Sequence, residues 1–222
     1  MQGSKLKFWN ILLATFLTSL QTLHAQKINS NVAMVLNMPV GSTSEVAGTG
    51  WGSVGGVGYN INERNAVIGE FMWNRMYPSG SVLQPLQTAS PPGNLNGNSN
   101  LYSLTGNYRY ELRGRMLGTY LIGGGGWYFR KNWLSREITA GTGTVCTPAW
   151  LWWGFTCTSG TVTADQKLAT STTDAWGVNA GIGMTVRVGE APYRLYTEAR
   201  YHYAPTKNFG TQFIAVTVGI RY

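Results

Sequence analysis

Apolar and polar residues alternate along the chain with a period of two, most clearly in its second half. Between residues 175 and 188, one set of alternate positions is apolar and comprises Trp176, Val178, Ala180, Ile182, Met184, Val186 and Val188. The stretches 101–112 and 193–203 alternate in the same way. Since successive side chains of a strand point to opposite faces of a sheet, this pattern predicts strands with one apolar and one polar face.

Turn signals divide the chain into eight segments of strand length. The predicted strands are 32–39, 50–59, 66–75, 101–112, 117–129, 175–188, 193–203 and 212–222. Short turns at 60–65, 113–116 and 189–192 alternate with longer connections at 40–49, 76–100, 130–174 and 204–211. Outer-membrane barrels have short periplasmic turns and long outer loops. The sequence therefore predicts an all-β fold, an eight-stranded antiparallel up-and-down transmembrane β-barrel.

Composition narrows the class of protein further. Of the 222 residues, 43% are hydrophobic and 13% aromatic, and only 12% are charged, which excludes a disordered chain. No apolar run is long enough for a membrane-spanning helix. The net charge of +8 is spread along the chain, so we expect it to meet anionic lipid headgroups rather than nucleic acid. Aromatic residues near strand ends, such as Tyr59 and Trp176, are typical of interfacial girdles.

Residues 1–25 have the pattern of a secretory signal peptide. Lys5 and Lys7 precede a short apolar segment, and Ala25 is a suitable cleavage residue. An amphipathic first helix is the alternative interpretation. We expect residues 26–222 to form one barrel domain. Export to an oxidising compartment predicts that Cys146 and Cys157 form a disulfide rather than a metal site.

Three segments carry a resemblance to a known family. They are the run 55–59 (GGVGY) before a short turn, the run 69–71 (GEF), and the final segment 213–222, whose alternate apolar residues end in Tyr222. The chain resembles the bacterial outer-membrane β-barrel domain family, the small eight-stranded barrels of the outer-membrane protein A, W and X type. The resemblance implies localisation in the bacterial outer membrane among its lipids. It also implies that Val218, Ile220 and Tyr222 form the signal read by the barrel assembly machinery, with Tyr where the family usually has Phe.

Charges of both signs are predicted on the lumen face of the barrel. They are Glu70, Arg109, Glu111, Arg187, Glu198 and Arg200, together with Arg221. An eight-stranded barrel has just enough room for its own side chains, and buried charges must pair. We therefore expect an ion-pair network that plugs the barrel. A gated narrow channel lined by the same residues is the alternative.

The sequence predicts no catalytic residue, no cofactor and no metal site. His202 is expected to line the lumen, and the His-x-Ser pattern of lipid deacylases does not surround it. The leading hypothesis is a non-enzymatic structural or surface-interaction protein with long extracellular loops. A small pore or uptake channel is the alternative, and an outer-membrane lipid hydrolase ranks third.

The longest predicted loop, 130–174, carries an unusual aromatic group between its two cysteines. The group comprises Trp150, Trp152, Trp153 and Phe155. One interpretation is a cap that packs on the barrel rim or the outer leaflet. The other is a preorganised contact site for an unknown extracellular ligand, because tryptophan is enriched at binding hot spots.

Overall fold

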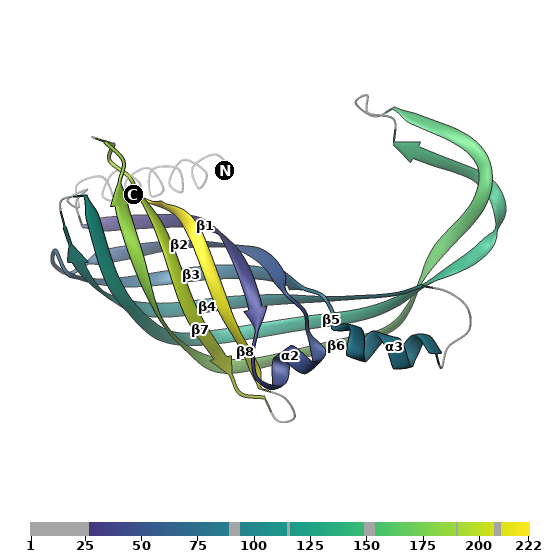
Figure 1. Ribbon diagram of the computed structural model, residues 1–222, viewed down its shortest axis with the longest axis horizontal. Coiled ribbons are helices and arrows are strands. Elements are labelled where there is room, and N and C mark those ends of the chain that lie inside the picture. The colour runs from purple at the N-terminus through teal and green to yellow at the C-terminus, as the bar shows by residue number, and fades with distance from the viewer. Residues whose placement is uncertain (1–26, 89–93, 115, 149–153, 190, 207–209) are drawn as a thin grey trace, which may run out of the picture.

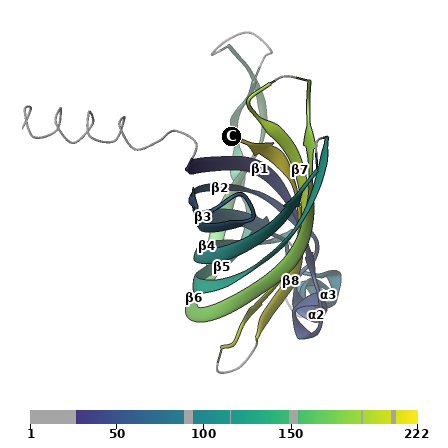
Figure 2. The ribbon, with the colours of Figure 1, turned by 90° about the vertical axis from the view of Figure 1, so that its left-hand side faces the viewer.

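The computed structural model describes residues 27–88, 94–114, 116–148, 154–189, 191–206 and 210–222. Its strands are β1 Ile28–Pro39, β2 Gly50–Asn60, β3 Asn65–Met76, β4 Leu95–Arg113, β5 Leu117–Pro148, β6 Phe155–Arg187, β7 Arg194–Ala204 and β8 Thr211–Arg221. Each strand pairs antiparallel with the next, and β8 pairs with β1, so the sheet is a closed barrel (Figures 1 and 2). The predicted eight-stranded barrel is confirmed. The expected signal segment lies outside the described residues.

The seam between β1 and β8 runs along the barrel from the pair Pro39–Phe213 to the end that carries the short turns. Ser30 N–H donates to the Tyr222 carbonyl at 3.2 Å, and Tyr222 N–H donates to the Ser30 carbonyl at 2.8 Å. Closure leaves no unpaired strand edge within the barrel, as a hydrocarbon environment requires.

The facing predicted from the alternation is confirmed in β4, β6, β7 and β8. In β6, for example, Ile182 is 63% exposed on the outside, whereas Asn179 and Thr185 are buried inside. Arg187 is the exception, because it was expected in the lumen and is exposed. It is the last residue of β6 and pairs with Arg194 at the end of the barrel, where its long side chain reaches solvent.

The prediction of a loop over residues 130–174 is wrong. Instead, β5 and β6 continue as an antiparallel pair to Pro148 and Phe155. β4 follows β5 as far as the pair Leu95–Arg136. Beyond it, residues 138–148 and 155–164, here called the arm, pair only with each other among the described residues. The arm projects away from the barrel and curves (Figure 1).

The other long connections also hold secondary structure. The 40–49 connection contains helix α2 (Ser42–Val46), and the expected loop 76–100 contains helix α3 (Gly80–Thr88) and the start of β4. Thr43 Oγ1 joins α2 to β8, because it donates to the Gly210 carbonyl at 3.0 Å and accepts from Gln212 N–H at 2.8 Å. Both helices therefore lie at the mouth opposite the short turns. In the described part of the chain, neither helix is long and apolar enough to cross a bilayer.

The glycine run 123–126 reflects close packing rather than a bulge. A Cβ at Gly126 would collide with the backbone of Leu104 and Thr105 on β4, and the register of β5 shifts only farther along, after Leu134. The inner wall of the barrel is therefore too crowded for a Cβ at Gly124 and Gly126, whereas a Cβ at Gly123 would meet its nearest neighbour at an ordinary 3.5 Å.

Candidate functional site

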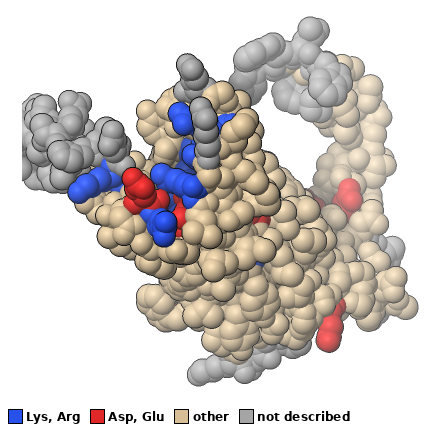
Figure 3. All heavy atoms as spheres, turned by 60° about the vertical axis from the view of Figure 1, so that its left-hand side comes forward, with Lys and Arg blue, Asp and Glu red and all other residues tan. Residues whose placement is uncertain are grey.

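The outer surface of the barrel is apolar and free of charge over a broad band. The outward positions of the eight strands, from Ile28 on β1 to Tyr222 after β8, hold no Asp, Glu, Lys or Arg between the aromatic rows at the two ends. On the face that Figure 3 shows, Lys and Arg side chains gather with some Asp and Glu at one end of the molecule, whereas other Asp and Glu lie apart from this group. Lys27, Glu63, Arg64, Arg113 and Arg187 are exposed at this end, which carries the short turns.

Aromatic side chains mark both borders of the band. Toward the arm, the rings of Trp51 and Trp73 meet edge to face with centroids 5.4 Å apart, and those of Trp127 and Phe129 stack at 5.7 Å. At the opposite end, exposed tyrosines include Tyr59, Tyr110 and Tyr222. An apolar band between two aromatic girdles is the surface of a β-barrel that spans a lipid bilayer.

The middle of the lumen is filled by a cluster around Arg200, which β7 points inward. Its guanidinium contacts Glu70 Oε2 at 2.6 Å through Nη1 and Glu198 Oε1 at 2.6 Å through Nη2. Asn31 and Asn107 donate their amide protons to Glu70 at 3.0 and 2.7 Å. Four strands, β1, β3, β4 and β7, thus contribute to one set of charge-assisted hydrogen bonds.

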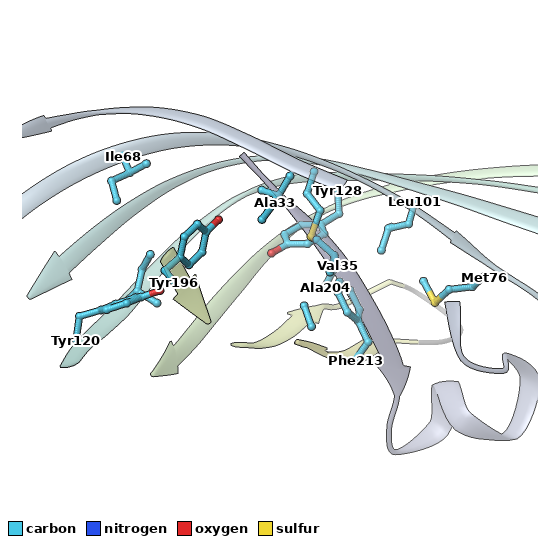
Figure 4. Close-up of a cluster of buried hydrophobic side chains, with 14 of the residues drawn as sticks. Ala33, Val35, Ile68, Met76, Leu101, Tyr120, Tyr128, Tyr196, Ala204 and Phe213 are labelled. Carbon is cyan, nitrogen blue, oxygen red and sulfur yellow. The ribbon is translucent and has the colours of Figure 1, made fainter. Parts of the chain in front are cut away.

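A second cluster surrounds Glu111, nearer the short turns. Glu111 contacts Arg109 at 3.4 Å, Arg113 at 3.3 Å and Arg221 at 4.0 Å. The Arg221 guanidinium lies over the rings of Tyr120 and Tyr196, 4.6 and 4.7 Å from their centroids. Figure 4 shows these two tyrosines inside the barrel, apart from Met76 and Leu101 toward the other mouth.

Tyr120 connects the two clusters. Its hydroxyl donates to Glu198 Oε2 at 2.9 Å in the first cluster, while its ring contacts Arg221 in the second. The described buried charges balance, with three carboxylates (Glu70, Glu111, Glu198) and three guanidiniums (Arg109, Arg200, Arg221). The cavity beside Glu70 and Arg200 has a volume of about 10 Å³, about the space of one water molecule. The described lumen is therefore a packed plug.

Of the seven charged residues predicted on the lumen face, six lie in these clusters and Arg187 does not. The arrangement also depends on Asn31, Asn107, Tyr120 and Tyr196, which the sequence did not single out. Asn107 was placed on the inner face by the alternation of its strand. Tyr120 was missed because the glycines that follow it obscure which face of β5 points inward.

His202 is buried and serves the packing of the lumen. One of its ring nitrogens, Nδ1, lies 2.8 Å from the Tyr128 hydroxyl, and its ring stacks on Phe213 with centroids 4.7 Å apart. The described contacts of this histidine therefore include no serine nucleophile and no carboxylate. Within the described ranges, no group of three or more His, Cys, Asp or Glu residues could hold a metal ion.

A disulfide joins the two strands of the arm near the end that is farthest from the barrel. Cys146 and Cys157 are directly opposite in the register and form a disulfide. The described part of the arm leads away from the barrel rim (Figure 1). Trp150, Trp152 and Trp153 lie outside the described residues, and Phe155 is the first residue of β6.

No protein-family model and no curated protein matches this sequence. Ail, the attachment invasion locus protein of Yersinia pestis, solved with the heparin analogue sucrose octasulfate, aligns at 15% identity over 88% of this chain and 97% of its own, with a TM-score of 0.46. Neisserial surface protein A aligns at 15% over 87% and 95%, with a TM-score of 0.43. OprG from Pseudomonas aeruginosa aligns at 9% over 88% and 94%, with a TM-score of 0.46. None of these similarities bears on what this chain binds.

Proposed function

We propose that this protein is an integral outer-membrane barrel that acts without catalysis, by presenting the arm to a partner outside the cell. The single observation that carries the proposal is the extension of β5 and β6 beyond every other strand. Each arm strand has about eleven residues, so it reaches roughly 35 Å at about 3.3 Å per residue. Such a projection is long enough to reach past the lipid headgroups.

The arm has the properties of a contact element. Residues 138–164 contain no charged side chain and are rich in threonine. The outer edges of its two strands pair with no other described strand, so their backbone N–H and C=O groups are available to a partner strand. The Trp-rich segment lies between the cysteines in the sequence. The disulfide would close it into a short ring, and the tryptophans of this ring would contact the extracellular ligand.

The packed lumen supports an anchoring role over the pore or uptake channel. Charged groups of the two clusters compensate one another, and Tyr120 fills the space between them. Moving ions through this lumen would require breaking ion pairs that the barrel wall holds in place. The apolar face of β8, with Val218, Ile220 and Tyr222 outward, suits the proposed signal for the barrel assembly machinery.

The proposal is tested by removing the arm. A variant in which Asn-Gly replaces residues 138–164 joins Glu137 to Asp165 through a tight hairpin turn. Because the barrel strands are untouched, we expect normal insertion and the usual heat-dependent gel mobility. Cells that carry this variant should lose the attachment to surfaces or cells that the full chain confers. Unchanged attachment would contradict the proposal.

Conductance separates the anchor from the channel. The full chain, refolded in a planar bilayer, should show no sustained conductance. Steady ion conductance that Arg200→Met alters would instead support the channel lined by the two clusters.

A further inference from the structure

A second feature of the outer mouth is an apolar cavity that the proposed function does not use. It has a volume of about 370 Å³ and lies between α2, α3, the start of β4, and the middle of β5 and β6, just below the arm. Its apolar lining includes Val46, Met76, Val82, Leu83, Leu86 and Trp133. A cavity of this volume is at the small end of the range for small-molecule sites.

Helix α3 forms one wall of this cavity with its apolar side. Val82, Leu83 and Leu86 line the cavity, whereas Gln84 and Gln87 do not. The helix start is held to α2, because the hydroxyls of Ser79 and Ser81 donate to the Glu45 carbonyl at 2.7 and 2.8 Å. Leu86 remains 40% exposed, so the apolar wall is not covered by the described chain.

Arg130 supplies the one cation that lines the cavity among the described residues. It lies on β5 at the mouth opposite the short turns, and its Nη1 donates to Thr211 Oγ1 on β8 at 2.9 Å. Its Nε is buried and has no hydrogen-bond acceptor among the described residues. None of the ion pairs in the described chain includes Arg130. A guanidinium with an open donor beside apolar walls can hold an anionic group with an apolar tail.

We propose that this cavity binds a single-chain anionic amphiphile of the fatty-acid class. The carboxylate accepts from the Arg130 guanidinium, whose planar fork of donors matches a carboxylate. The hydrocarbon chain lies along Val82, Leu83 and Leu86, where burial removes apolar surface of both partners from water. The volume suits one chain and a small head rather than a two-chain phospholipid. Because the lumen below is packed, the ligand is held at the mouth and not passed through.

Binding of cis-parinaric acid, a fluorescent fatty acid, to the full chain in lipid nanodiscs tests this proposal. We expect saturable binding that laurate displaces and that lauryl alcohol, which has no charge, displaces about tenfold less well. Arg130→Gln should weaken binding about tenfold and remove the preference for laurate. Arg64→Gln, at the short-turn end, is the matched control and should bind as the wild type does.

Further variants and competitors separate the possible outcomes of this experiment. Leu83→Asn keeps Arg130 and should weaken laurate and lauryl alcohol alike, and retained heat-dependent gel mobility shows that each variant is folded. The variant without the arm should still bind, so failure here is distinct from failure of the proposed function. Equal binding by wild type and Arg130→Gln would overturn the proposal. So would displacement of the probe by phosphatidylglycerol with no effect of laurate, because the occupant would then be a membrane lipid.

Discussion

At the scale of single residues, the packing of the lumen must meet two requirements. Its polar side chains must pair, since water has little access, and its wall must leave room for them. Arg200 satisfies two carboxylates on different strands, Glu70 and Glu198, at 2.6 Å each. Gly124 and Gly126 leave out the side chain where strand backbones approach too closely for a Cβ. Ion pairing and glycine placement are therefore parts of the same packing problem.

Removing the central cation should destabilise the barrel strongly. Arg200→Met leaves Glu70 and Glu198 buried without their shared partner, and breaking a buried pair costs about 3–5 kcal/mol. The measurement is the urea midpoint of unfolding from lipid vesicles. Arg64→Gln, in an exposed turn, should shift the free energy of unfolding by less than about 0.5 kcal/mol. Equal midpoints for the two variants would show that the Arg200 contacts contribute nothing.

A pair of glycine variants tests the crowding of the inner wall. Gly126→Ala places a methyl group against the Leu104 carbonyl, which the strand pairing holds in place, and overpacking costs about 1–3 kcal/mol. Gly106→Ala is the matched control, because a Cβ there meets nothing within 4 Å. The same unfolding assay should show a loss of stability in the first variant alone. Equal stability of the two variants would mean that the backbone of β4 can move to make room for the added methyl group.

At the scale of elements, the sequence predicted the strands whose two faces differ chemically. In β4, β6 and β7 the alternation of apolar and polar residues reflects lipid on one side and lumen on the other. The arm strands were missed because both of their faces meet water, so threonine and glycine recur without an apolar period. The facing of β2 and β5 was ambiguous because glycines such as Gly55 and Gly125 carry no polarity signal. The Arg130 cavity depends on where α3 packs, which local sequence does not determine.

The disulfide should matter for the arm and not for the barrel. Two-stranded ribbons without further packing are marginally stable in water, and a cross-link over 11 residues contributes about 3 kcal/mol by reducing loop entropy. Cys146→Ser combined with Cys157→Ser should therefore speed proteolysis within the arm, as mass spectrometry of the cleaved fragments would record. Heat-dependent gel mobility should stay unchanged. Cleavage at the wild-type rate would mean that strand pairing alone holds the arm.

At the scale of the whole molecule, the two ends of the barrel differ in a way that fixes its proposed orientation. One end has short turns and exposed charges such as Arg64 and Arg113, and β1 begins and β8 ends there. The other end has α2, α3, the Arg130 cavity and the arm. Every proposed contact with the outside therefore lies on one side of the lipid band, and the plugged lumen separates it from the short turns.

Labelling of single cysteines on intact cells tests this orientation. In a chain with Cys146→Ser and Cys157→Ser, Thr139→Cys lies on the arm and Glu63→Cys lies in a short turn, and both wild-type residues are exposed. A charged, membrane-impermeant maleimide should label Thr139→Cys directly, because the arm extends into the medium. It should label Glu63→Cys only after the outer membrane is permeabilised. The reverse pattern would place the arm in the periplasm, where it could not meet an extracellular partner and the proposed function would fail.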